Sequence, residues 1–315
     1  MVKLSAFCLN SYIVSDILTI CGNLFINTKG VVKMKVLIIG AHEDDIEFRN
    51  AGMTIKFKQL GHDVRFLCLC NGNGGHHILS PEETARVRKG ETQQVAKILG
   101  VQYDIWEDVS DCEIEATLEN RKRLTRYIRE YNPDIICTHR INDYHADHRA
   151  TAQLVQDASY LLIVPHFCPE VPAMKSMPVI MQTVDAFKNP EFRADVVIGI
   201  DDEIETKLEC VRCHRSQIYE WLPYTKGETV PESEEERVEW MKGMNITADT
   251  TDEEVLAATR GYSVRFAKVA ARFRKELIEK YGEEKGSKIR YAEALMLSEY
   301  GKQLTDENKD TYFPF

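Results

Sequence analysis

Lys35-Val36-Leu37-Ile38-Ile39-Gly40-Ala41-His42-Glu43-Asp44-Asp45 is the stretch around which the chain is organised. Its aliphatic residues 36–39 run without a polar interruption, which predicts a strand buried on both faces of a parallel sheet. Gly40 allows the backbone to turn sharply where this strand ends. Ligands of open α/β sheets bind outside the carboxyl ends of the strands, so His42, Asp44 and Asp45 fall where such a sheet holds its chemistry.

The spacing of these polar residues suggests a division of roles. If a helix begins after His42, then His42 and Asp45 lie three residues apart on one face, and Asp44 points elsewhere. One carboxylate can then bind a metal while its neighbour accepts a proton. The alternative for this stretch alone is an aspartate-rich helix N-terminus whose side chains cap the first amides.

Composition and charge narrow the class of protein. The 315 residues are 43% hydrophobic and 29% charged, which is ordinary for a soluble globular protein, and the length suits one large α/β domain or one domain with an appended helical part. The net charge of -10 argues against nucleic acid as the main partner. Nine cysteines, an odd and scattered set, fit a reducing compartment, so we expect a cytoplasmic protein. The Cys-x-x-Cys-His pattern at 210–214 matches haem attachment, but no convincing export signal precedes it.

Residues 1–33 are treated separately. Leu4 to Ile26 is fairly apolar but interrupted by polar residues, and it is too polar for a membrane span. Met34 stands directly before the first strand, so we expect it to be the functional start and residues 1–33 to be an upstream extension. Mass spectrometry that finds an intact Met1 terminus in cells would refute this.

Strand and helix patterns alternate along the chain. We expect helices at 46–60, 81–99, 118–131 and 262–281, and strands at 36–39, 64–70, 103–106, 135–137, 179–183 and 196–200. This order predicts a Rossmann-like, doubly wound, mostly parallel α/β sheet. Residues 34–201 would form the catalytic sheet region, and residues 202–315 a mostly helical part that completes the same domain. Within that part, residues 223–239 are acidic and predict a surface excursion.

A second polar cluster follows the strand at 135–137. Residues 138–149 contain three of the chain's nine histidines, and His145 and His148 repeat the three-residue spacing seen before. If the two clusters meet, His42, Asp45 and His148 surround one metal. Two imidazoles and a carboxylate are a catalytic zinc set with the fourth position left for water, and iron(II) or cobalt(II) can occupy the same ligands.

These two clusters resemble the signatures of the PIG-L/LmbE-like metal-dependent de-N-acetylases, which read Ala-His-Pro-Asp-Asp and His-Pro-Asp-His. Here Glu43 and Ala146 replace the two prolines, while each chemically active position is kept. The resemblance covers roughly Met34 to the C-terminus. It also includes Pro133-Asp134-Ile135, the helix from Arg88 to Gly100, His214-Arg215-Ser216-Gln217 and Tyr291-Ala292-Glu293-Ala294.

The resemblance implies a role for each matching residue. The implied zinc ligands are His42, Asp45 and His148, and the implied general base is Asp44. His145, oriented by Asp147, would be the acid or oxyanion partner. Arg88 and, more loosely, Asp111 would contact the substrate. His214 matches a family position for which we expect a structural hydrogen bond.

The resulting hypothesis is hydrolysis of an N-acetyl group by zinc-bound water, with Asp44 taking the proton and protonated His145 stabilising the oxyanion. The resemblance implies an N-acetylglucosamine-type small molecule or glycoconjugate as substrate. From charge and polarity we expect no nucleic acid partner and no membrane insertion, and homo-oligomerisation is left open. The alternatives are an amidase or esterase for a non-sugar compound and a non-catalytic binding protein. A nucleotide-binding module would need Gly-x-Gly-x-x-Gly after the first strand, which this chain lacks.

Overall fold

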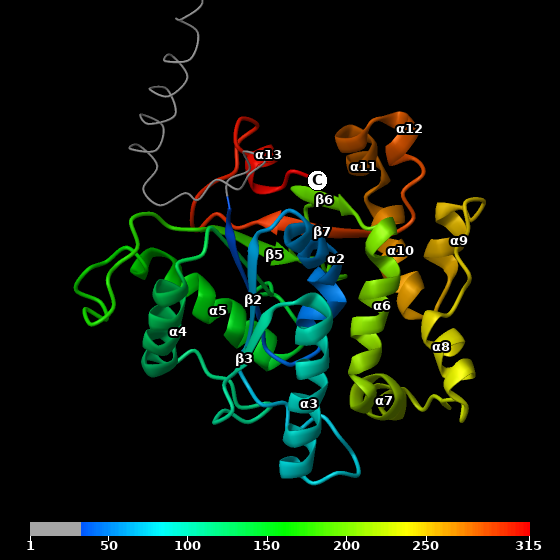
Figure 1. Cartoon of the computed structure of the whole chain (residues 1–315), viewed down its shortest axis with the longest axis horizontal. Helices are drawn as coiled ribbons and strands as arrows, with labels where there is room; N and C mark the ends of the chain where they lie inside the picture. Colours follow the sequence, from blue (N-terminus) through cyan, green and yellow to red (C-terminus); the bar gives the residue numbers. More distant parts are fainter. Residues whose placement is uncertain (1–32) are drawn as a thin grey trace, which may run out of the picture.

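A seven-stranded sheet forms the centre of the computed structural model, which describes residues 33–315; the predicted extension therefore lies outside the described residues except for Lys33. The strand order is β3-β2-β1-β4-β5-β7-β6 (Figure 1). The strands are β1 Lys35–Gly40, β2 Asp63–Cys68, β3 Gln102–Ile105, β4 Ile135–Thr138, β5 Val179–Thr183, β6 Val196–Gly199 and β7 Ala292–Leu297. Strands β1 to β5 pair in parallel, and β7 is antiparallel to both of its neighbours. The predicted mostly parallel α/β fold is confirmed.

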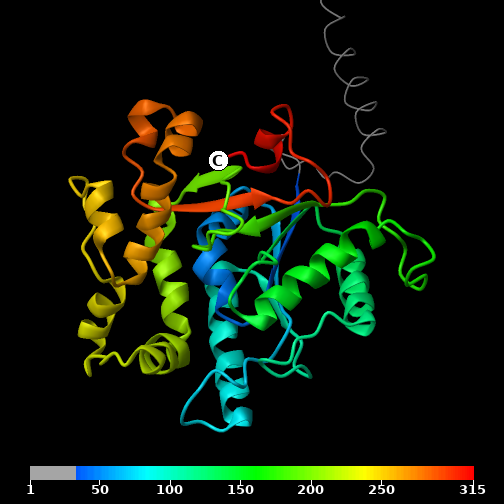
Figure 2. The same ribbon diagram turned by 180° about the vertical axis from the view of Figure 1, so that it is seen from behind.

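Strand β1 is buried on both faces because it alternates between two hydrophobic cores. Val36 and Ile38 belong to one core, and Leu37 and Ile39 belong to the other. Helices cover both faces (Figures 1 and 2). Those on the first face are α2 Asp45–Gln59, α3 Pro81–Leu99 and α6 Ile204–Cys213, and those on the second face are α4 Leu118–Tyr131 and α5 Ala146–Leu161.

Local signals fix the ends of helix α3 where the sequence predicts them. The Ser80 hydroxyl accepts a hydrogen bond from the Glu83 amide, and the Glu83 carboxylate accepts one from the Ser80 amide. This reciprocal cap satisfies two donors that would otherwise lack partners at the helix start. At the other end, Gly100 adopts the left-handed conformation at φ 63°, which glycine tolerates best.

Two of the differences between the C-terminal part and its prediction concern helices. Its elements are η1 Asp201–Glu203, the π-helical η2 Ser216–Trp221, α7 Leu222–Lys226, α8 Glu234–Lys242, α9 Asp252–Ala257, α10 Tyr262–Arg272, α11 Arg274–Tyr281, α12 Glu283–Gly286 and α13 Lys309–Tyr312. The helix expected at 262–281 is broken at Phe273, whose φ of -115° and ψ of 34° are not helical. The acidic run lies on the surface, but its second half forms the exposed first turns of α8.

Strand β7 was not predicted, and it is the one strand within residues 202–315, a part of the chain that was expected to be mostly helical. It lies between β5 and β6 and brings Glu293 against helix α2. The Glu293 carboxylate accepts hydrogen bonds from the Gly52 and Met53 amides, each at 2.8 Å, and pairs with the Lys207 ammonium. A Cβ at Gly52 would lie 2.6 Å from Ile200 Cγ2, so this close approach requires glycine.

The topology brings the two polar clusters of the sequence together. Strands β1 and β4 are adjacent and parallel, with Val36 opposite Ile135 and Ile38 opposite Cys137. The chain leaves β1 toward β2 on one side and reaches β4 on the other, so their carboxyl ends form a switch point of the sheet. Within residues 33–315, no helix is both long and apolar enough to cross a membrane.

Candidate metal and catalytic site

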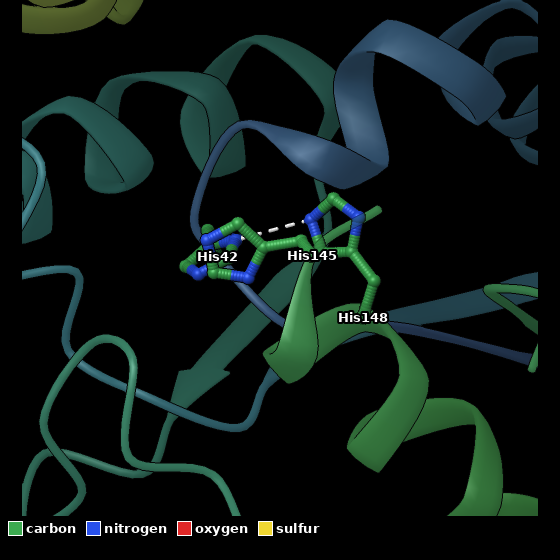
Figure 3. A group of neighbouring side chains, drawn as sticks. All are labelled: His42, His145 and His148. Carbon is green, nitrogen blue, oxygen red and sulfur yellow. Dashed lines mark hydrogen bonds between the residues drawn. The ribbon is translucent and has the colours of Figure 1, made fainter. Parts of the chain in front are cut away.

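Three imidazoles gather at the carboxyl edge of the sheet. His42 follows β1 by two residues, and His145 and His148 come from the start of α5 after β4. Their ring centroids lie 4.7 to 5.2 Å apart. Figure 3 shows the three side chains gathered in one place. Residues separated by about a hundred positions therefore share one site.

The three residues predicted to bind metal lie in mutual contact. His42 Nδ1 is 3.3 Å from His148 Nε2 and 3.3 Å from Asp45 Oδ2. His148 Nε2 is 3.2 Å from Asp45 Oδ1. In a tetrahedral zinc site with bonds of about 2.0–2.1 Å, neighbouring ligand atoms are about 3.3–3.4 Å apart. The separation of the two imidazole nitrogens is close to an edge of such a site, and Asp45 reaches the two rings through different carboxylate oxygens.

Surrounding carboxylates determine which ring nitrogens carry hydrogen. Asp143 Oδ1 lies 3.0 Å from His148 Nδ1. On the other imidazole, His42 Nε2 lies 3.0 Å from Asp111 Oδ1 and 3.2 Å from Asp147 Oδ2. An ionised carboxylate only accepts hydrogen bonds, so in the neutral imidazoles these outer nitrogens donate and the inner nitrogens present lone pairs to each other. Two facing lone pairs beside an anionic carboxylate repel unless a cation lies among them, so the donor set fits a divalent metal.

A proton competes with the metal for this cluster. Burial by itself lowers the pKa of His148, but the carboxylates of Asp45 and Asp143 outweigh burial and raise it to about 9. His148 of the metal-free protein is therefore protonated at neutral pH, and a metal must displace that proton to bind.

Asp44 lies beside the donor cluster and makes different contacts. Its Oδ1 accepts a hydrogen bond from Arg88 Nη2 at 3.1 Å, and its side chain makes no capping bond to α2. The alternative of an N-terminal cap is therefore wrong for this residue. The Asp44 side chain is 13% exposed, whereas those of Asp143 and Asp147 are 1% and 0% exposed. Asp44 is thus better placed than those two acids to exchange a proton with water.

His145 is placed to donate a hydrogen bond as a neutral ring. Its Nδ1 accepts from the Asp147 amide at 3.2 Å, so the ring hydrogen is on Nε2. Burial, followed by the charges of His42 and His148, lowers the pKa of His145. The protonated His145 expected from the sequence is therefore disfavoured near neutral pH, and a neutral N–H donor takes its place.

Known proteins share this arrangement of sequence and fold. The family described as PIG-L, GlcNAc-PI de-N-acetylase, matches residues 37–159. The chain is 31% identical to the diacetylchitobiose deacetylase of Thermococcus kodakarensis over 202 residues. This aligned region covers 61% of this chain and 75% of that protein. The chain belongs to the PIG-L family. The predicted family and enzyme class, a de-N-acetylase hydrolase, are confirmed.

Two further proteins extend the PIG-L likeness. The chain is 24% identical over 233 residues to a probable N-acetyl-α-D-glucosaminyl L-malate deacetylase 2 of Bacillus anthracis, covering 66% of this chain and 91% of that one. The structure of the present chain resembles that of the N,N'-diacetylchitobiose deacetylase of Pyrococcus horikoshii, with a TM-score of 0.61 and 22% identity over 95% of each chain. At this identity the structural likeness shows a shared fold.

This PIG-L member departs from the family motif at Glu43, which stands where the motif has proline. Glu43 is fully buried, with its Oε2 3.3 Å from Arg88 Nε, and Arg88 Nη1 donates to the Gly72 carbonyl at 3.2 Å. A Cβ at Gly72 would lie 2.2 Å from Glu43 Oε2, and its φ is +60°, so the loop needs glycine here. Arg88 is only 2% exposed and pairs with Glu43 and Asp44. The sequence had instead predicted that Arg88 binds substrate hydroxyls.

Asp111 and Asp147 both face His42. Besides that contact, the Asp111 amide donates to Asn73 Oδ1 at 2.9 Å, so its loop packs on the loop after β2. The Asp147 carboxylate accepts from the Cys112 amide at 2.7 Å and contacts His42, while only its backbone amide reaches His145. The expected orientation of His145 by Asp147 therefore comes from the amide rather than the carboxylate.

Two residues of the site were not assigned from the sequence. His139 stacks on His148 with centroids 4.2 Å apart and an interplanar angle of 9°, and its Nε2 lies 3.2 Å from Asp45 Oδ2. Burial is the main cause that lowers the pKa of His139 to about 4, so it is a neutral ring. Asp143 orients His148. Both residues belong to the polar stretch after β4, and this position in the sequence could have identified them as part of the site.

His214 lies away from the metal cluster. Its Nε2 is 3.4 Å from Glu47 Oε2, and both side chains are fully buried beneath α2. The Cys-x-x-Cys-His pattern begins inside α6, where Cys210 is part of the hydrophobic core. His214 is therefore a buried residue in ion-pair contact with Glu47, whereas a structural hydrogen bond was expected.

Proposed function

We propose that this protein is a metal-dependent hydrolase that removes the N-acetyl group of an N-acetylglucosamine-type small molecule or glycoconjugate. The observation that carries the proposal is the convergence of two imidazole lone pairs and the Asp45 carboxylate, with the outer nitrogens of both rings held by other carboxylates. The likeness to deacetylases of diacetylchitobiose and of N-acetylglucosaminyl malate supports the substrate class.

The residues that would hold the metal are His42, Asp45 and His148. Two imidazoles and one carboxylate suit zinc best, and iron(II) and cobalt(II) accept the same ligands. When bound, a divalent cation polarises the acetyl carbonyl and lowers the pKa of water.

The remaining chemistry falls to side chains beside the metal ligands. Asp44 accepts a proton from water as the water oxygen bonds to the carbonyl carbon, and Arg88 fixes the direction of the Asp44 carboxylate. His145 donates its Nε2 hydrogen to the developing oxyanion. As the C–N bond breaks, Asp44 returns its proton to the nitrogen, so that acetate and a free amine leave.

The role of Asp44 gives the direct test. Asp44→Asn should keep the metal and lower kcat by about 10²- to 10⁴-fold, because only proton transfer is removed. Acetate release from methyl N-acetylglucosaminide and elemental analysis of the same preparations measure both quantities. Full activity of the variant would remove Asp44 from the base role. Release of acetate from simple acetamides but from no N-acetyl sugar would favour the non-sugar amidase.

The location is also part of this proposal. The seven cysteines among the described residues are free thiols, which supports a cytoplasmic protein.

A further inference from the structure

A recessed cavity of about 270 Å³ lies among η2, α7, α8 and α10, on the side of α2 that carries Phe48. These helices are grouped together in both ribbon views (Figures 1 and 2). The side chains that characterise its lining are Ile218, Leu222, Trp240, Tyr262, Arg260 and Arg265. The cavity therefore combines apolar and aromatic walls with positive charge.

Arg265 has no carboxylate partner among the described residues, unlike Arg260 and Arg237. Arg260 lies 3.5 Å from Glu228, which also lines the cavity, and Arg237 lies 3.3 Å from Glu234. Arg265 contacts the face of the Phe48 ring, 5.4 Å from the ring centroid, and it retains exposed surface. Its guanidinium donors are thus available to a ligand.

The cavity adjoins the catalytic residues through Phe48. Phe48 lies in the first turn of α2, one turn after Asp44, and its ring packs on Tyr262 of the cavity wall with centroids 5.3 Å apart. Burial and the charge of Arg49 lower the pKa of Arg265, while the charges of Asp44 and Asp45 act in the opposite direction. A substrate whose acetyl group lies at Asp44 can therefore extend toward Arg265.

We propose that this cavity is a subsite for an anionic group, a carboxylate or a phosphate, on the part of the substrate that is linked to the N-acetylated sugar. This inference rests on the proposed function and deepens it, because it separates acidic N-acetylglucosamine conjugates from neutral chito-oligosaccharides. A guanidinium binds either oxyanion through two parallel hydrogen bonds. The aromatic walls pack against the apolar faces of the connecting group, and Glu228 is already engaged by Arg260.

The kinetic test compares three substrates: N-acetylglucosaminyl L-malate, N-acetylglucosamine 1-phosphate and neutral diacetylchitobiose. The metal-loaded protein should prefer at least one anionic substrate over the neutral one by about tenfold or more in kcat/KM. Arg265→Met should abolish that preference by raising KM for the anionic substrate, with the neutral substrate unchanged. Arg237→Met is the matched control and should keep the preference. Malate selectivity identifies a carboxylate site, and 1-phosphate selectivity identifies a phosphate site.

A binding measurement keeps the test independent of catalysis. Calorimetry should show that glucosamine 1-phosphate or glucosaminyl malate binds the wild type about tenfold more tightly than Arg265→Met, while methyl glucosaminide binds both equally. Equal binding of the anionic products by both proteins would overturn the subsite. Deacetylation of neutral sugars without any anion preference would overturn the subsite but leave the proposed function standing. Anion binding without deacetylation of any N-acetyl sugar would overturn the proposed function but leave the anionic subsite standing.

Discussion

Asp45 and Glu293 are two buried carboxylates beside the same helix, and their surroundings differ in one respect. Glu293 accepts hydrogen bonds from two amides of α2 and pairs with the Lys207 ammonium, so the chain supplies its countercharge. Asp45 accepts from the His42 amide, and its carboxylate faces ring nitrogens of His42, His139 and His148. A buried acid paired with a lysine holds the fold together, whereas Asp45 faces a titratable imidazole whose proton a metal can displace.

Loss of His148 should have the largest effect on the Asp45 site. Removing a residue that only orients a metal ligand costs about 10- to 100-fold, so His148→Ala should lower deacetylase activity by at least about 1,000-fold. Elemental analysis should find no metal in the variant. The control is His166→Ala, which removes an exposed histidine and should change neither quantity. A His148→Ala protein with one metal per chain and normal turnover would contradict the ligand assignment.

Removing the internal cation should instead destabilise the fold. Lys207→Met leaves Glu293 buried without its countercharge, so the free energy of unfolding should fall by about 3–5 kcal/mol. Urea unfolding measures this loss. Metal content per folded chain should stay the same, because Lys207 is outside the donor cluster. If the variant were as stable as the wild type, the Lys207–Glu293 pair would not be a source of stability for the fold.

The pH dependence should distinguish the metal-free and metal-loaded cluster. The pKa of His148 is about 9 in the metal-free fold, above its usual value of about 6.5. The resulting stabilisation, about 3 kcal/mol, is fully present below pH ~6.5 and is lost as pH rises through about 9. Urea unfolding of metal-free protein at pH 6.5 and 9.5 measures it. His148→Gln should flatten this dependence, and an unaltered slope in that variant would assign it to another group.

Glu43 should give the smallest of these effects. Glu43→Gln keeps the shape but removes one negative charge from Arg88, which should then bind Asp44 more strongly and make it a weaker base. We expect kcat to fall by about tenfold with unchanged metal content. Glu107→Gln, which alters an exposed ion pair with Lys89, is the control. An unchanged kcat would mean that Glu43 supports only the loop at Gly72.

The parts of the fold that the sequence predicted were those with strong local signals. Val36 to Ile39 is continuously aliphatic, and Pro81 and Gly100 mark the ends of α3, so these elements were predicted closely. Strand β7 was not, because Ala292-Glu293-Ala294-Leu295-Met296-Leu297 consists of strong helix formers. Its place in the sheet depends on pairing with β5 and β6 and on the contacts of Glu293, which local propensity does not reveal.

The candidate site shows the same limit at the level of single residues. Adjacent parallel strands bring His42 and His148 together, and that outcome follows from strand order. The direction in which Arg88 points does not follow from it, because the side chain is drawn inward by Glu43, Asp44 and the Gly72 carbonyl. Such a choice depends on the sum of neighbouring charges in three dimensions.

The bond from the Gly52 amide to Glu293 joins residues 241 positions apart. During synthesis on the ribosome, the helix that carries Asp45 emerges long before the strand that anchors it. The early sheet must therefore remain without this support while the intervening helices are made, and the buried edge of β5 needs protection during that interval. Assembly of the catalytic centre is thus tied to the late arrival of β7.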